Sequence, residues 1–579
     1  MAISPSTHAL GQAINLVLVL TGLLVTYLTL PTTAANLVAS TVVLDTPQKL
    51  DDTLGKPLAA ETQLCLYNLT NGLELLQPAG ASAPKPTFER ICVAALANSQ
   101  FFDFNLSADA SEYSALRWSN ITLVDDADWA LEVVTLNADM VGVIGALGGE
   151  ATLAAIQPLL YGALAMDAAV LKPDGTGALN GGIFVRLTFE QYFRGYTTSI
   201  LGTDNLVAAA LNLYSFSSVG ALRDAIASGA EPAQKHTTTV RTGAGNNIQH
   251  IGELSSYKGY TSLTTIDASH TPNQITGAMN WGLYEAPWDN AGSVNPATKG
   301  DFNVDCVRML GSPQPPLPAA SYPAAFFTLS GVDGVTGASG DSSLDIFDPQ
   351  WSRSVRYDPA ASDKLHGALH TNKYTFSDAN GQITSAGIAS ATCAPLCDYG
   401  MTDAHVWQGA DGLTYTLPAY GLANKTRSKI TLLDSSGSEQ YFDATTEAPS
   451  VWIEPFTGAT VQARTGVLTA ITLQKAWLDG SLFSTVLTSD ASGDAGFVWP
   501  MFEIKATFGL TADEAQQLAG AISLPYLLLR LAALLGGLSA LSSVVLIIVC
   551  LSRTRSRSQA KVGARTEPVD KLQAAEKGQ

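Results

Sequence analysis

The chain has 579 residues and a formal net charge of −19, although charged residues make up only 14% of it. The tail from Ser552 onward holds seven basic and three acidic residues, which leaves a charge of −23 on the rest of the chain. A surface this acidic repels phosphate groups, so nucleic-acid binding is excluded, and solubility outside the cell is the simplest reason for the acidity.

Two uncharged apolar stretches stand close to the ends of the chain, Leu10–Leu30 and Leu531–Leu551. As helices, each would be roughly 31 Å long, which is enough to cross the hydrocarbon core of a bilayer. The sequence therefore predicts a cytoplasmic N-terminus (1–9), two transmembrane helices (10–30 and 531–551), an extracytoplasmic domain (31–530) and a basic cytoplasmic tail (552–579).

The orientation of these stretches follows from the basic residues behind the second one, Arg553, Arg555, Arg557 and Lys561, because such a cluster marks the cytoplasmic side. The first stretch has an alternative interpretation as a cleaved signal peptide, with small residues around Ala34 as the cleavage site.

The N-terminal part of the middle region reads as strands followed by helices. The apolar runs around Cys65 and Cys92, QLCLYNL and RICVAAL, are typical of paired strands. From about 128 to 229, Ala- and Leu-rich pieces predict helices, and Ser218–Ala227 has apolar residues at helical spacing.

Beyond Thr237 the strand pattern dominates. Apolar runs on both sides of a Ser-Ser-Gly turn predict a hairpin over 429–442. Thr511 and Glu514 have the spacing of a capping box, which predicts the start of a helix that leads into the second apolar stretch.

Cysteines and sequons both indicate an oxidising compartment. Four Asn-x-Ser/Thr sequons lie between the apolar stretches and predict N-glycosylation at Asn68, Asn105, Asn120 and Asn424. The candidate disulfides pair Cys65 with Cys92 and Cys393 with Cys397, which leaves Cys306 free or bonded to another chain, and other connectivities stay open. Cys550 is a candidate for S-palmitoylation, with an inert buried thiol as the alternative.

Eight short motifs follow one another between the apolar stretches. They are YNLTN (Tyr67–Asn71), FVRLTFEQYFRGY (Phe184–Tyr196), TGAGNNIQHIGELSSYKGY (Thr242–Tyr260), ITG (Ile275–Gly277), FNVDCVR (Phe302–Arg308), LTYTLPAYGLA (Leu413–Ala423), WIEPFTG (Trp452–Gly458) and FVWPMFE (Phe497–Glu503). In this order they resemble the motifs of the class B scavenger receptor family, which contains fatty-acid translocase and the lysosomal integral membrane proteins. The resemblance spans nearly the whole chain, and WIEPFTG is its most specific part.

The resemblance implies a mainly β fold with some α: an antiparallel β-barrel ectodomain with a helical apex near 128–229, anchored by one transmembrane helix at each end. It also implies a lipid-sized tunnel through the barrel. Two features depart from the family: the cysteine expected soon after Cys397 is missing, and the apex over Asp139–Asn180 is acidic. An apolar or uncharged ligand therefore fits the apex better than an anionic particle.

The apex residues expected to meet such a ligand share apolar side chains; they are Val141, Val143, Ile144, Leu147, Ile156 and Leu160. Packing between helices is the alternative explanation of these residues.

No catalytic signature emerges from the chain, which has neither a P-loop, nor a G-x-S-x-G elbow, nor an H-E-x-x-H motif. His366 and His370 have the spacing of metal ligands on one helix, but their surroundings read as strand or loop, so surface histidines are expected and no metal or cofactor is.

The function expected from the sequence is that of a membrane-embedded, non-enzymatic glycoprotein receptor at the plasma membrane, with endosomal or lysosomal membranes as the alternative site. Its partners would be fatty acids, sterols or lipoprotein-like particles, taken up by endocytosis or passed through the tunnel, and a homo-oligomer is left open. The alternatives are an adhesion or protein-recognition receptor of the same fold without lipid transport, and a hydrolase with a cleaved signal peptide.

Overall fold

The computed structural model describes residues 29–75, 85–136, 184–194, 196–200, 203–207, 218–228, 237–245, 248–257, 308–309, 343–348, 353–366, 369–378, 401–403, 413–423, 428–455, 457–474 and 496–563, together with 16–17, 20–21 and 24. The chain divides into two compact units. The first holds the described residues of Met1–Thr41 and Gln516–Gln579, and the second holds those of Val42–Pro315 and Ser339–Ala515.

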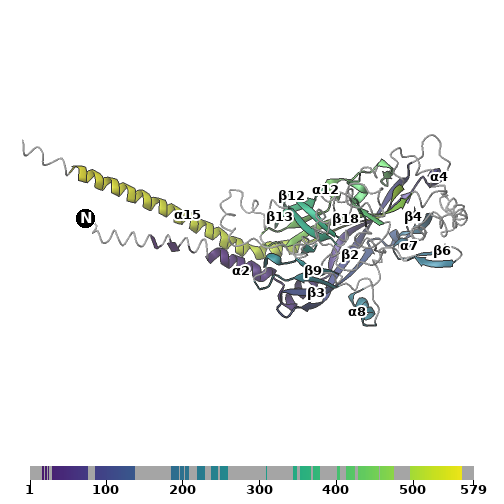
Figure 1. Ribbon diagram of the computed structural model, residues 1–579, viewed down its shortest axis with the longest axis horizontal. Helices are drawn as coiled ribbons and strands as arrows, with labels where there is room; N and C mark the ends of the chain where they lie inside the picture. The colour runs from purple at the N-terminus through teal and green to yellow at the C-terminus, as the bar shows by residue number, and fades with distance from the viewer. Residues whose placement is uncertain are drawn as a thin grey trace, which may run out of the picture. The chain divides into compact units, whose positions relative to one another are not determined.

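The first unit is helical. It contains α2 (Leu30–Val42) and most of α15 (Ala512–Gly563), which has 52 residues and is labelled in Figure 1. In the part of the chain that the structure describes, no helix is both long and apolar enough to cross a membrane. This finding overturns the expectation of one transmembrane helix at each end.

The start of α15 lies in the second unit and confirms the predicted capping box. The backbone N–H of Glu514 donates to Thr511 Oγ1 at 3.3 Å, and the backbone N–H of Thr511 donates to Glu514 Oε2 at 2.8 Å. These two bonds satisfy N–H groups that have no partner within the helix, and they fix where the helix begins.

The second unit is built mainly of antiparallel strands (Figure 1). They are β1 (Leu58–Leu69), β2 (Thr87–Leu106), β3 (Glu112–Leu123), β4 (Glu132–Leu136), β5 (Phe184–Thr188), β6 (Tyr196–Ile200), β7 (Thr203–Val207), β8 (Thr237–Arg241), β9 (Leu254–Tyr257), β10 (Arg308–Met309), β11 (Leu344–Asp348), β12 (Arg353–Leu365), β13 (Leu369–Phe376), β14 (Met401–Asp403), β15 (Leu413–Thr416), β16 (Thr431–Leu433), β17 (Ser450–Ile453), β18 (Thr460–Gln474) and β19 (Gly496–Gly509). The helices are α3 (Pro47–Leu54), α4 (Gly72–Leu75), α7 (Phe189–Arg194), α8 (Val219–Ala227) and α12 (Ala444–Glu447), with the short 3-10 helices η2 (Asp126–Ala130), η3 (Ile248–His250) and η9 (Pro418–Tyr420).

Most of these strands form one sheet, in the order β10-β11-β12-β13-β17-β18-β19-β1-β2-β3-β8-β9. Three further strands join it, β15 beside β18, β14 beside β15, and β16 beside β2. The expected β-barrel is therefore wrong, because closing a sheet requires its two end strands to pair. Among the described residues no pairing joins β10 to β9, so the sheet is an open path.

The centre of this sheet is covered on both faces. Successive side chains of a strand point to opposite faces, so Leu64 and Leu66 of β1 lie on one face, and Cys65 and Tyr67 lie on the other. All four are at most 1% exposed. A strand buried on both faces has a continuous apolar run, which explains the sequence QLCLYNL around Cys65.

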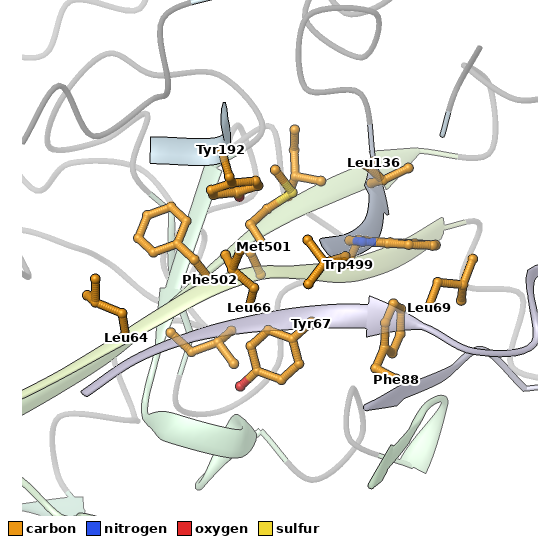
Figure 2. Packing of buried hydrophobic residues seen from close by; sticks show 14 of the residues in the cluster. Leu64, Leu66, Tyr67, Leu69, Phe88, Leu136, Tyr192, Trp499, Met501 and Phe502 are labelled. Carbon is orange, nitrogen blue, oxygen red and sulfur yellow. The ribbon is translucent and has the colours of Figure 1, made fainter. Parts of the chain in front are cut away.

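The largest core of the molecule packs around this centre and takes in residues from both faces of β1, among them Leu66 and Tyr67 (Figure 2). Trp499 of β19 is fully buried, and its ring meets Phe88 edge-on with 4.7 Å between ring centroids. Phe184 of β5 approaches the same indole at 5.7 Å. Aromatic rings from strands that are distant in sequence therefore fill this part of the interior.

Several local predictions are confirmed in this unit. The helix expected over Ser218–Ala227 forms as α8, where the Ser218 hydroxyl accepts the backbone N–H of Ala221 at 3.2 Å. Cys65 lies directly opposite Cys92 on the paired strands β1 and β2. The hairpin over 429–442 forms, with a bridge between Leu433 and Glu439. The region 128–229 differs from expectation: its described residues include β4, β5, β6 and β7 besides α7 and α8.

Candidate functional site

A group of ionisable side chains lies buried on the second face of the sheet's centre. We call it the buried charge cluster; it consists of Tyr67, Arg90, Glu447, Glu503 and Lys505. The sheet register explains why they meet, because Tyr67 pairs with Arg90, and Cys65 pairs with Glu503. Side chains of directly opposed residues share a face, so β1, β2 and β19 each contribute to one constellation.

Glu503 lies at the centre of the cluster and is fully buried. Its Oε2 accepts the hydroxyl of Tyr67 at 2.7 Å and the backbone N–H of Ala419 at 3.1 Å. Its Oε1 accepts Arg90 Nη2. Both carboxylate oxygens thus have donors, which is the condition for keeping a charge out of water.

Glu447, at the end of α12, is the second acid of the cluster. Its Oε1 accepts Arg90 Nη1 at 3.1 Å and Lys505 Nζ at 2.8 Å, and its Oε2 accepts the backbone N–H of Asp443 at 3.1 Å. Arg90 therefore bridges the two acids, while Lys505 Nζ also lies 3.6 Å from Glu503 Oε1. Two bases balance two acids, so the cluster as a whole is neutral.

The electrostatics hold Tyr67, Arg90 and Glu447 each in one protonation state. Burial and then the charge of Glu503 raise the pKa of Tyr67 well above its ordinary value, so the phenol stays protonated. Burial alone would raise the pKa of Glu447, but the hydrogen bond from Lys505 and the charge of Arg90 hold it below the ordinary value. The surrounding negative charges raise the pKa of Arg90 against the effect of desolvation. A general acid or base needs a pKa near the working pH, and the shifts at Tyr67, Glu447 and Arg90 run away from neutrality.

The cluster is closed by the η9 turn. Ala419 and Tyr420 have φ angles of 49° and 61°, in the left-handed region that non-glycine residues avoid. The bond from Ala419 to Glu503 holds the first of them, and the Tyr420 hydroxyl donates to the Val498 carbonyl at 3.2 Å. The buried charge cluster thus ties a strained turn and α12 onto three strands. Because Arg90 and Glu503 are buried at its centre, the cluster acts as an internal tie between segments.

The Cys65–Cys92 disulfide lies on the same face, two residues along the strands from the pair of Tyr67 and Arg90. It joins β1 to β2 where Cys65 is fully buried. Covalent and ionic links therefore fasten the same pair of strands.

The remaining residues expected to carry function are placed as follows. The apex residues Val141, Val143, Ile144, Leu147, Ile156 and Leu160, the cysteines Cys393 and Cys397, and Asn424 lie outside the described residues, as does the side chain of Cys550. Asn68 lies on β1, Asn105 on β2 and Asn120 on β3.

His366 directly follows β12 and His370 lies on β13, and His366 Nε2 lies 2.8 Å from the carbonyl oxygen of Leu510. The described residues contain no group of three His, Cys, Asp or Glu side chains placed to hold a metal ion.

The sequence motifs fall on turns and core where they are described. In WIEPFTG, Glu454 is fully buried and accepts the N–H of Thr457 at 2.7 Å, which shapes the turn between β17 and β18. Gly243 in the long motif has a φ of 79°, and a Cβ there would lie 3.0 Å from Ile251 Cβ, so only glycine fits. In these two motifs the described residues shape turns of the fold.

Sequence reasoning missed the buried charge cluster. One local signal existed: Arg90, Glu503 and Lys505 are charges inside otherwise apolar strands, and such charges are buried only when paired. Their pairing could not be read, because Arg90 is 413 residues from Glu503 in sequence.

Compared with models of known protein families and with curated proteins, the chain matches none.

Proposed function

We propose that the protein is a non-enzymatic glycoprotein receptor of an oxidising, extracytoplasmic compartment, at the cell surface or in the endosomal system, and that it binds lipids or lipid-bearing particles. The Cys65–Cys92 disulfide is the main observation that supports an oxidising compartment. Structural disulfides persist in secreted and cell-surface proteins, whereas cytosolic thiols are kept reduced.

Two further observations support the proposal. Asn105 is an exposed sequon on a sheet that also carries the disulfide. The ordered motifs, from Tyr67–Asn71 to Phe497–Glu503, resemble those of a lipid-handling receptor family, and this resemblance supports the lipid class of ligand. The buried charge cluster supports a rigid scaffold: its members are tied to one another and not to a surface.

The test is photo-crosslinking in eukaryotic cells that express the full-length chain. Cells are fed a fatty acid or a sterol that carries a diazirine and an alkyne, irradiated, and the purified chain is scored for attached lipid and mapped by mass spectrometry. We expect labelling that unlabelled lipid competes away and that concentrates on a few peptides. Labelling no greater than that of an unrelated glycoprotein at equal expression would overturn the lipid-binding proposal.

A second candidate is a receptor for a protein partner. The observation that favours it is the aromatic filling of the interior around Trp499. Phe88 lies beside the indole (Figure 2), and Phe184 approaches it at 5.7 Å. A packed interior leaves recognition to the surface. In the crosslinking experiment this candidate is the one that survives if lipid labelling is absent.

A further inference from the structure

The three described sequons lie on different faces of the same sheet. Directly opposed residues share a face, and Asn120 pairs with Asn98, while Thr122 pairs with Leu96. We call this side of β2 and β3 the outer face. It is the side opposite Ile121 and Leu123, which belong to the largest core.

Asn105 also belongs to the outer face. It pairs with Ser114, which has the same parity along β3 as Asn120. Asn105 is exposed and Asn120 is half-buried, and neither side chain has a hydrogen bond to a residue that the structure describes. Both amide groups are therefore available to carry a sugar.

Asn68 differs from Asn105 and Asn120 in the face of the sheet on which it lies and in the hydrogen bonds of its side chain. It lies on the opposite face of β1 from Tyr67, the side on which Leu64 and Leu66 enter the core. Its Oδ1 accepts the backbone N–H of Val134 at 2.9 Å, and its Nδ2 lies 3.4 Å from Glu89 Oε2. The amide thus fastens β4 to β1, and a carboxylate occupies the position that a sugar on Nδ2 would need.

The outer face also carries a solvent-exposed apolar strip. Leu96 is 40% exposed and Val124 is 64% exposed, and Ala94 lies beside them. Toward Trp118 the face is covered by α8, whose Leu222 packs on Phe102 and Trp118. Asn120 lies between the covered part and the strip, because its pair with Asn98 is two residues along the strands from the pair of Leu96 with Thr122.

We propose that Asn105 and Asn120 carry N-linked glycans on the outer face, that Asn68 carries none, and that the Asn120 glycan covers the strip formed by Leu96 and Val124. The inference rests on the extracytoplasmic compartment of the proposed function. The first sugar of a glycan has an apolar face of ring C–H groups, which suits a cover for exposed aliphatic side chains. The outer face of β2 and β3 would then be shielded from partners, and the ligand would meet the receptor elsewhere.

The first experiment measures which sequons are occupied. The full-length chain is purified from eukaryotic cells, treated with peptide-N-glycosidase in heavy-oxygen water, and its peptides are examined for Asn converted to labelled Asp. We expect conversion at Asn105 and Asn120 and unmodified Asn68. Conversion at Asn68 as complete as at the other two would overturn the discrimination between sites. No conversion at any sequon would instead overturn the extracytoplasmic compartment.

The second experiment tests the cover. Asn120→Gln removes one glycan and keeps Thr122 beside Leu96, and Asn105→Gln is the matched control, because it removes a glycan from the other side of α8. Hydroxyl-radical footprinting should give severalfold more oxidation of Leu96 and Val124 in Asn120→Gln than in Asn105→Gln. Equal oxidation in the two variants would overturn the covering role while leaving the occupancy result intact.

Discussion

Replacing Arg90 by Met tests whether the buried charge cluster ties the sheet together. The substitution keeps an unbranched apolar side chain and removes the guanidinium that bridges Glu447 and Glu503. Glu447 keeps Lys505 at 2.8 Å, but Glu503 keeps only neutral donors and an ammonium at 3.6 Å. The cluster changes from neutral to a net charge of −1 at a site where Glu503 has no exposed surface.

The expected cost follows from this uncompensated charge. Breaking a buried ion pair by removing one partner costs about 3–5 kcal/mol. With each 1.4 kcal/mol worth a factor of ten, amide protection in β1, β2 and β19 should fall roughly a hundred- to a few-thousandfold. The measurement is native-state hydrogen exchange followed by mass spectrometry on peptides that cover these strands.

Arg223→Met is the matched control. Arg223 pairs with Asp103 at 2.7 Å, but the two side chains are 52% and 48% exposed, so the loss should be about 0–1 kcal/mol. The double variant Arg90→Met with Glu503→Gln tests the charge argument, because the second change makes the cluster neutral again. Glu503→Gln should lower the unfolding free energy of the parent chain but raise that of Arg90→Met. The reasoning is refuted if Arg90→Met costs no more than Arg223→Met, or if Glu503→Gln harms both backgrounds equally.

Three further outcomes are expected. Lys505 and Arg90 hold the pKa of Glu447 below its ordinary value of 4.5 against the effect of burial. The stabilisation that ionised Glu447 contributes is therefore complete above that pH and is lost as the pH falls through the lower pKa of the folded state. Glu447→Gln should flatten the acid limb of an unfolding titration below about pH 4.5. Changing Cys65 and Cys92 together to Ser should lower the unfolding free energy by about 3–4 kcal/mol in denaturant melts, and a loss within error would contradict the disulfide. Thr511→Ala should cost about 1 kcal/mol, seen as faster exchange in the first turn of α15, whereas Thr511→Ser should cost little.

Elements with a strong local signal could be predicted from the sequence. Apolar residues at helical spacing within Ser218–Ala227 predicted α8. The Thr511 and Glu514 pair predicted the start of α15, because caps act within one turn of the helix. The runs around Cys65 and Cys92 predicted β1 and β2 for a similar reason: an apolar run of strand length already indicates burial on both faces.

The closure of the sheet could not be predicted in the same way. Alternation along a strand says which residues share a face, but closure depends on whether the two end strands pair. Those ends are β10 and β9, and β9 is reached through β3 and β8, whereas β10 is reached through β11 and β12. The local sequence of neither strand indicates which strand it pairs with, so the prediction of a barrel rested on the family resemblance alone.

The buried charge cluster shows why alternation along a strand does not by itself reveal the environment of a polar face. In β19, Glu503 and Lys505 alternate with Phe502 and Ile504, a period-two pattern that normally indicates one face in solvent. The structure instead brings η9 and α12 over that face, so Glu503 is fully buried and Lys505 is half-buried. Alternation thus identifies the face that Glu503 and Lys505 share, but it does not say what covers that face. The two environments differ in the charge balance that they require. A face in solvent tolerates a surplus of acidic or basic side chains, but a covered face requires as many bases as acids within reach. The two bases Arg90 and Lys505 and the two acids Glu447 and Glu503 meet that requirement.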